Sequence, residues 1–125
     1  MRDLLLQGIE EFNSGSFFEA HDMWEELWVE TRGEERLFYQ GLIQTAVGLY
    51  HFENANYRGA FSQFGKALAK LQRFCPSCKG VDTEQLVQDL ERWVRSVSCR
   101  NAGDTGVALI QAPEIRLSSR EGESK

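Results

Sequence analysis

Residues 35–54 read ERLFYQGLIQTAVGLYHFEN, a stretch that predicts an α-helix with apolar side chains around most of its circumference. A helix on a protein surface carries one apolar stripe, whereas a helix that is apolar on nearly every side is surrounded by other elements. Gly41, Thr45 and Gly48 form a further side, where a neighbouring helix can approach closely. The stretch therefore indicates the central helix of an all-α fold.

Helix start and stop signals lie on both sides of this central helix. Ser16, with Glu19 three residues later, is a capping-box pattern that predicts a helix N-terminus, and Gly33 predicts the end of that helix. Further along the chain, Pro76 stops a fourth amphipathic stretch. We expect a compact bundle of about five helices with low strand content. The expected helices cover about residues 2–13, 17–31, 34–54, 57–74 and 82–101.

An apolar pattern recurs 40 residues apart in the second and fourth expected helices. Both copies follow a turn rich in Asn, Ser or Gly, and large and small residues at this spacing are typical of helix-pair repeats. Two amphipathic helices with a large–small stripe can also align this well without being repeats, so both interpretations stay open. The pattern consists of Phe17, Ala20, Trp24 and Leu27, and then of Tyr57, Ala60, Phe64 and Ala67.

The last part of the chain differs in composition from the helical part. Residues 107–117 hold apolar side chains around Pro113, which suits an extended segment lying on the helices. Residues 118–125 are polar, so we expect a disordered tail there. The sequence therefore predicts a helical domain over residues 1–103, followed by an extended segment and a tail over residues 104–125.

Composition argues against several classes of protein. The formal net charge is −5 and no basic run occurs, so we expect no nucleic-acid partner. The longest uncharged stretch, residues 37–52, is shorter than the about 20 apolar residues that span a membrane, and it contains polar side chains. No signal-peptide pattern opens the sequence, and three cysteines do not make a disulfide framework. We therefore expect a cytoplasmic protein without a membrane partner.

Two of the cysteines form a CxxC pattern at Cys75 and Cys78. This pattern follows the end of a helix, whereas redox motifs place their cysteines at a helix N-terminus, which lowers the thiol pKa. Zinc would need two further ligands, and Cys99 supplies one. We therefore expect structural thiols.

Polar residues interrupt the apolar faces of the second and third helices. His21 falls inside the apolar arc of the second helix, and Glu25, four residues later, projects inward beside it. Helices joined by a short loop pack antiparallel, which brings His21 level with His51 and Glu25 level with Gln44. The sequence thus predicts a buried polar site between these helices. The polar stripe of the third helix consists of Arg36, Gln40, Gln44, His51 and Asn54.

The residue types at this site suit metal chemistry. Two imidazoles and one carboxylate form the three-ligand set of many catalytic zinc and non-haem iron sites. We therefore expect His21, Glu25 and His51 to be the metal ligands and catalytic residues, with a divalent ion such as zinc. Alternatively, Glu25 is the base that activates a bound water, and in both cases the reaction is hydrolysis of a small molecule.

Four further polar residues are candidates for binding the substrate. Gln40 and Gln44 would orient it by hydrogen bonds. Arg32 and Arg36 flank the loop between the second and third helices, where they would meet an anionic group. The alternative for these arginines is pairing with surface acids such as Glu34.

Two other interpretations compete with the metal-dependent hydrolase. In the first, the polar stripe is a hydrogen-bond network that fixes helix register, and the chain is a non-enzymatic interaction module resembling helical repeats, which binds a partner through a surface groove. In the second, the polar residues form a metal-free site for a small-molecule ligand. The sequence does not indicate the substrate or the oligomeric state.

Ordered motifs also give the chain a family resemblance. The motifs are FNSGSFFEAHDMWEELW at residues 12–28, QGLIQTA at 40–46 and YH at 50–51, with NYRGA at 56–60 and ALAKL at 67–71. Over about residues 5–74 the chain resembles the family called domain of unknown function 309. The resemblance implies a compact, all-helical protein, and some descriptions of the family label it a predicted metal-dependent hydrolase.

The resemblance includes the polar residues singled out above. Asp22 stands where glutamate is common in the family, and the helical projection turns it toward solvent. The resemblance therefore points to the same face of the second and third helices as the residue pattern does. The matching motif positions are His21, Glu25, Trp28, Gln40, Gly41, Gln44 and His51.

Overall fold

Five α-helices follow one another in the part of the chain that the computed structural model describes, residues 3–101 and 113–118. This confirms the predicted all-α bundle, with helix bounds close to the expected ones. A short 3-10 helix, η1, and a two-stranded antiparallel hairpin lie between the last two helices. The elements are α1 (Leu4–Asn13), α2 (Phe17–Glu30), α3 (Glu35–Glu53), α4 (Tyr57–Leu71), η1 (Gln72–Phe74), β1 (Ser77–Cys78), β2 (Val81–Asp82) and α5 (Thr83–Asn101).

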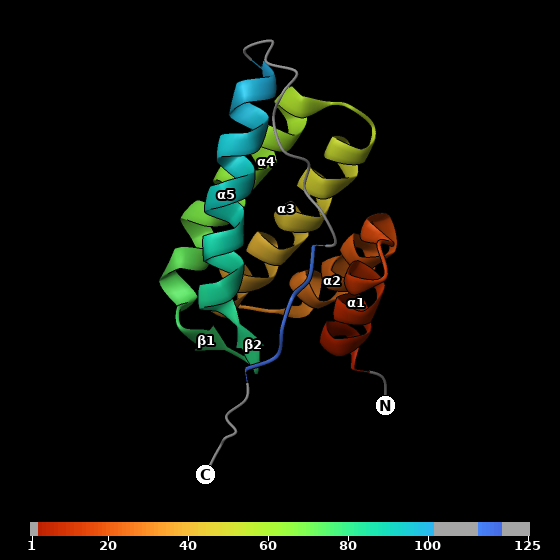
Figure 1. The fold of residues 1–125 in the computed structure, drawn as a ribbon. Coiled ribbons are helices and arrows are strands. Elements are labelled where there is room, and N and C mark those ends of the chain that lie inside the picture. Colours follow the sequence, from red (N-terminus) through yellow and green to blue (C-terminus); the bar gives the residue numbers. More distant parts are fainter. Residues whose placement is uncertain (1–2, 102–112, 119–125) are drawn as a thin grey trace.

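The helix α3 lies in the middle of the fold, with α1 and α2 on one side and α4 and α5 on the other (Figure 1). Each helix packs chiefly on its neighbours in the sequence. Phe38, Leu42 and Ala46 of α3 are fully buried, which confirms the central helix. Trp93 attaches α5 to this core, because its ring lies 5.6 Å from the ring of Phe64 on α4. None of the described helices has the length and apolar character that a membrane span requires.

The turns of the α1–α2 and α3–α4 hairpins have the same geometry, 40 residues apart. In the first turn the amide of Ser16 donates to the carbonyl of Glu11 over 2.8 Å, and in the second the amide of Asn56 donates to His51 over 2.8 Å. The residue before each N-cap has a positive φ, +90° at Gly15 and +61° at Ala55. The sequence repeat therefore reflects two similar helix pairs.

The packing inside the two hairpins is also equivalent. Gly8 of α1 faces the ring of Trp24, and Gly48 of α3 faces the ring of Phe64. In both hairpins the missing side chain lets an aromatic ring of the following helix lie against the helix backbone. One expected detail is wrong, because the side chain of Ser16 makes no capping hydrogen bond. The main-chain bonds of the turn hold the entry into α2 instead.

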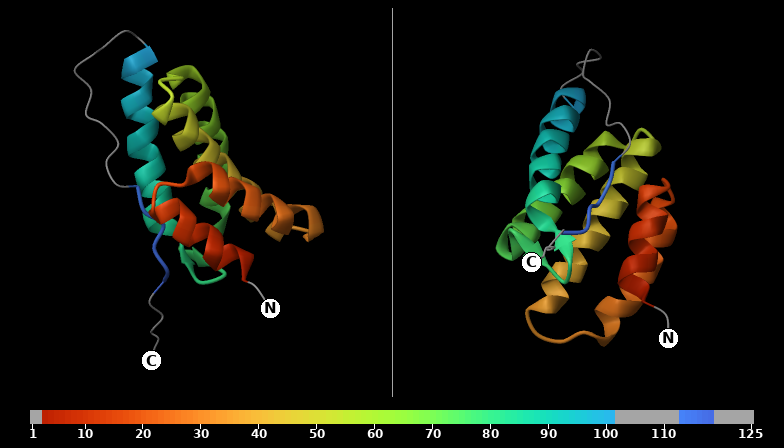
Figure 2. Two further views of the ribbon diagram at one scale, coloured as in Figure 1. Left: turned by 90° about the vertical axis from the view of Figure 1, so that its right-hand side faces the viewer. Right: turned by 60° about the horizontal axis from the view of Figure 1, so that its bottom comes forward.

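The described end of the chain, residues 113–118, is an extended segment that runs between α1 and β2 (Figures 1 and 2). Ile115 is 2% exposed, and the side chain of Asn13 accepts from its amide over 2.8 Å and donates to its carbonyl over 3.0 Å. The amide of Asp82 donates to the carbonyl of Arg116 over 2.8 Å. These contacts confirm the extended segment for residues 113–117. Of the predicted tail over residues 118–125, Ser118 is described, and its amide donates to the carbonyl of Gly80 over 2.8 Å. Residues 107–112 and 119–125 lie outside the described residues, and the domain boundary at residue 103 stays a prediction.

Candidate functional site

His21 lies on α2 with an exposed side-chain fraction of 19%. Its Nε2 atom lies 3.2 Å from Oε2 of Glu25, one helical turn later. On the other side of the ring, Nδ1 lies 3.3 Å from the carbonyl oxygen of Phe18 and 3.6 Å from Oδ1 of Asp22. His21, Asp22 and Glu25 each offer a ligand atom, and these atoms lie within 4.8 Å of one another.

The carboxylate of Glu25 is more exposed than expected. The side chain of Glu25 is 53% exposed, so the expectation that it turns into a buried site is wrong. It stands about 100° around the helix from Trp24, whose side chain is fully buried, and it therefore projects beside the core. Asp22 faces solvent as expected, yet it also contacts His21. The cluster is a surface feature of α2 with a half-buried imidazole.

The contacts of the His21 ring bear on which of its two nitrogens carries a proton. A carbonyl oxygen can only accept, so the contact with Phe18 is satisfied when Nδ1 of His21 carries a proton. In the neutral imidazole Nε2 is then a lone-pair acceptor, and it faces the carboxylate oxygen of Glu25 at 3.2 Å. With the ring proton on Nδ1, these two acceptors would be stabilised by a further proton on Nε2 or by a bound cation.

Beside His21 there is a pocket of about 200 Å³ between α2 and α3. His51 of α3 lies on the lining of the same pocket, so the structure brings both histidines to one place. The rings of Phe18 and Tyr50 lie 5.7 Å apart and are 50% and 41% exposed. The pocket is thus open and mainly apolar, and its lining residues carry two imidazoles and the hydroxyl of Tyr50 as polar groups. Its lining consists of Phe17, Phe18, His21, Val47, Tyr50 and His51.

His51 contacts the first turn of α4, through Asn56. Its Nδ1 atom lies 3.3 Å from Nδ2 of Asn56, and Oδ1 of Asn56 accepts from the amide of Gly59 over 3.0 Å. His51 is not part of the group formed by His21 and the carboxylates of α2. The predicted three-ligand set of His21, Glu25 and His51 therefore stays a proposal, and the structure adds Asp22 to its neighbourhood.

The predicted substrate-binding residues are not among the residues that line this pocket. Arg36 stacks on Trp28, with its guanidinium carbon 3.8 Å from the ring centroid, and its Nε donates to the Trp28 carbonyl over 3.3 Å. Gln44 is half-buried, and its Oε1 atom is buried without a hydrogen-bond partner among the described residues. Gln40 is half-buried, and Arg32 is exposed. The structure thus gives Arg36 a packing contact and leaves the other three roles untested.

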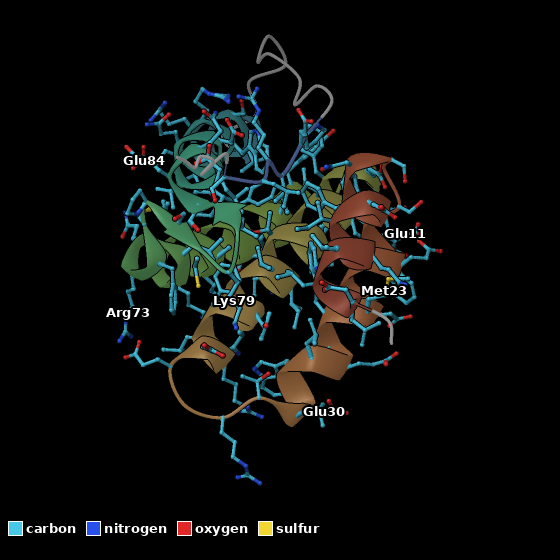
Figure 3. The ribbon with its side chains drawn as sticks, turned by 90° about the horizontal axis from the view of Figure 1, so that it is seen from below. Glu11, Met23, Glu30, Arg73, Lys79 and Glu84 are labelled. Atoms are coloured by element: carbon cyan, nitrogen blue, oxygen red, sulfur yellow. The ribbon has the colours of Figure 1, made fainter. Side chains whose placement is uncertain are left out.

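The acids of the α2–α3 loop pair with bases other than Arg32 and Arg36. Glu34 pairs with Arg73 over 2.7 Å, and Glu35 pairs with Lys79 over 3.3 Å. Figure 3 views this end of the molecule from below, with Arg73 and Lys79 labelled. These pairs tie the start of α3 to the segment after α4.

The environment of the CxxC pattern agrees with structural thiols. Burial raises the pKa of the Cys78 thiol, and the nearby positive charge of Lys79 lowers it by less. Burial also raises the pKa of the Cys75 thiol, and the carboxylates of Glu84 and Asp82 add to that effect. A redox-active cysteine needs a lowered thiol pKa, whereas the pKa values of both these thiols are raised.

Sequence reasoning missed several residues of this site. It assigned Phe18 to the apolar arc, although its ring is half exposed at the pocket, and it assigned Asp22 to solvent alone. It also missed Asn56, whose amide lies against His51. The signal that could have found Asn56 is its position as the N-cap of α4, because capping side chains have a fixed orientation.

Comparison with known proteins supports the family resemblance. Residues 5–62 match the family described as "Domain of unknown function (DUF309)", which confirms that resemblance. A protein of Aquifex aeolicus (strain VF5), described as an uncharacterized protein, is 28% identical over 90 residues. That alignment covers 71% of this chain and 27% of the relative, so the chain spans about a quarter of the relative's length.

Proposed function

For a chain whose residues 5–62 match the DUF309 family, we propose a divalent-cation site on α2 that serves the hydrolysis of a small molecule held in the adjacent pocket. The observation that carries the proposal is the contact between Nε2 of His21 and the carboxylate of Glu25 at 3.2 Å. A cation between these two acceptors would stabilise a pair of groups that otherwise need a shared proton.

The donor set fits such an ion. Histidine ligands of metals commonly donate their other ring N–H to a carbonyl or a carboxylate, which fixes the ring and its tautomer. His21 has this arrangement, because Nδ1 faces the carbonyl of Phe18 and the carboxylate of Asp22. His21 and Glu25 would therefore hold the ion, and Asp22 would orient the imidazole. A bound divalent ion polarises a substrate carbonyl and lowers the pKa of water, which is the chemistry of hydrolysis.

The exposure of the cluster weakens the alternative in which these residues are a structural network. Partners that are half exposed remain hydrated, so an ion pair between them contributes little to folding. Replacing His21 would also strand no buried partner in this cluster, since both carboxylates are solvent-accessible. The place of these three groups beside an open pocket supports a ligand role instead.

One observation favours a binding module as the second candidate. The exposed rings of Phe18 and Tyr50 form an aromatic edge beside the pocket, and exposed aromatics are enriched at binding surfaces. In this alternative the pocket binds a partner or a small molecule without turnover. The two candidates differ in whether a metal is bound and whether a bond is broken.

The test uses the untagged full chain and Mn²⁺, which prefers oxygen and nitrogen ligands and so avoids the cysteines. Isothermal titration should show one Mn²⁺ per chain, lost in His21→Ala and in Glu25→Gln. The matched control is Glu26→Gln, which changes an exposed carboxylate on the same helix and should bind as the native chain does. Equal binding by the native chain and by His21→Ala, or none by the native chain, would overturn the metal site.

Hydrolysis is tested separately with p-nitrophenyl acetate and p-nitrophenyl butyrate. We expect Mn²⁺-dependent release of nitrophenol by the native chain, and loss of that release in Glu25→Gln. If Mn²⁺ binds stoichiometrically but neither these esters nor amide and phosphate analogues are cleaved, the binding module is the better description.

A further inference from the structure

The side chain of Asn56 has one possible orientation. Its Oδ1 atom accepts from the amide of Gly59 over 3.0 Å, and a rotated amide would place a donor against that N–H group. The Nδ2 atom is therefore the one that faces Nδ1 of His51 at 3.3 Å. The helix start of α4 thus fixes a hydrogen-bond donor next to the His51 ring.

This donor fixes the tautomer of His51. Because Nδ2 of Asn56 donates, Nδ1 of His51 must accept, and the proton of the neutral imidazole lies on Nε2. Metal ligation by Nε2 needs a lone pair there, which this tautomer does not offer. His51 is accordingly suited to donate a hydrogen bond through Nε2, whereas Nε2 of His21 faces the carboxylate of Glu25.

The fold does not require the contact between His51 and Asn56. The equivalent turn between α1 and α2 has Glu11 and Ser16 at the same positions. It forms the same main-chain bond of 2.8 Å, and Ser16 makes no side-chain capping bond. The turn geometry is thus available without the contact between these two side chains.

The pocket lined by His51 has the dimensions of a small apolar group. Its volume is about 200 Å³, and a protein cavity of about 150 Å³ accommodates benzene. The side chains of Phe17, Phe18, Val47 and Tyr50 would surround such a group. The polar groups of the lining residues are the two imidazoles and the hydroxyl of Tyr50. Of the imidazoles, Nε2 of His21 faces the carboxylate of Glu25, whereas the contact with Asn56 leaves Nε2–H of His51 as a donor.

We propose that the pocket binds small carbonyl compounds with a ring-sized apolar body, and that Nε2–H of His51 donates to the carbonyl oxygen. The inference rests on the proposed function, because esters or amides of this class would be its substrates. It narrows their class to compounds with an aryl or branched acyl group. It also assigns Asn56 as a positioning residue that acts through His51.

The tautomer is tested by nitrogen-15 NMR of the imidazole rings in the full chain, after EDTA treatment so that no metal is needed. In the neutral state of His51 we expect the proton on Nε2. Asn56→Asp keeps the acceptor for the Gly59 amide and replaces the donor by a second acceptor, so it should move the proton to Nδ1. Asn54→Asp, with the same charge change in the same turn, should leave the proton on Nε2.

The ligand class is tested by NMR titration of the same metal-free protein with benzamide and with toluene, which has no acceptor. Benzamide should bind with its largest shifts at the pocket residues, and about two- to tenfold more weakly to His51→Phe and to Asn56→Asp. Toluene should bind the native chain and both variants equally. The proposal is overturned if Nδ1 carries the proton in the native chain, if benzamide does not bind, or if His51→Phe binds it as well as the native chain.

These outcomes are independent of the metal site. A chain that fails to bind Mn²⁺ but discriminates benzamide from toluene through His51 would refute the cation proposal alone. A chain that binds Mn²⁺ but shows no dependence on His51 would refute the carbonyl-binding role alone.

Discussion

The close approach of α3 and α4 at Gly48 predicts a large difference between two Gly→Ala substitutions. A Cβ atom added at Gly48 would lie 2.6 Å from two ring carbons of Phe64, which is well inside van der Waals contact. Phe64 is fully buried and its ring also packs against Trp93, so it has little room to move. Gly65, in the interior of α4, is exposed and has no atom within 4 Å of the added Cβ.

The expected free energies follow from these two environments. In a helix interior, alanine is favoured over glycine by about 1 kcal/mol, a gain available at both positions. At Gly48 an overpacking cost of about 1–3 kcal/mol opposes that gain. Gly65→Ala should therefore stabilise the chain by about 1 kcal/mol, and Gly48→Ala should leave it unchanged or destabilise it by up to about 2 kcal/mol.

The assay is urea unfolding followed by circular dichroism at the helix band, with both variants measured beside the native chain. The slope of free energy against urea should be the same in all three, so the midpoints report the difference directly. Equal stabilisation by both substitutions would refute the close contact between Gly48 and Phe64. Stabilisation by Gly48→Ala together with destabilisation by Gly65→Ala would refute the assignment of Gly48 to the packed face of α3 and of Gly65 to the exposed face of α4.

Further predictions concern the extended segment at residues 113–118 and the thiol of Cys78. Ile115→Ala should cost about 2–5 kcal/mol in the free energy of unfolding because the side chain is buried, and Asn13→Ala should speed hydrogen exchange at the amides of Ile115 and Asp82. Unchanged exchange, or an equal effect of the exposed control Glu114→Gln, would contradict the docked segment. Lys79→Gln should raise the pKa of the Cys78 thiol further, because the Lys79 charge lowers it; the exposed control Lys66→Gln should not. Since the folded pKa of this thiol lies above its ordinary value of 9.0, its contribution to stability is present below pH 9 and is lost as pH rises through the folded value. The measurement is the rate of Cys78 alkylation as a function of pH, followed by peptide mass spectrometry. A lower apparent pKa of Cys78 in Lys79→Gln than in the native chain would contradict the reasoning.

The sequence predicted the helices well because their signals are local. The apolar circumference of residues 35–54 identified the central helix, and α3 runs from Glu35 to Glu53. The β1–β2 hairpin was missed because it depends on a two-residue turn in which Lys79 and Gly80 both have positive φ, 51° and 81°. A lysine at such a position gives no sequence signal for this turn. Strand content is low, as expected, since each strand has two residues.

The candidate site was predicted less completely because its geometry is not local. A helical projection places Glu25 next to His21, but it cannot say where the neighbouring helix stops covering that face. In the structure Glu25 is exposed and contacts His21 from the solvent side. The link between His51 and Asn56 depends on how a turn folds back between two helices, which a projection of a single helix cannot describe.

The two helix pairs supply an internal control for which residues packing alone requires. Gly8 and Gly48 occupy equivalent positions, and each lets an aromatic ring of the next helix pack against the helix backbone. The residues around the pocket have no such equivalence: His21 corresponds to Phe61, Glu25 to Gly65, His51 to Glu11 and Asn56 to Ser16. Because one helix pair forms without each of these polar groups, the geometry of a pair does not account for them. What the polar groups share is a place at or beside one pocket, which is the observation on which the proposed ligand site rests.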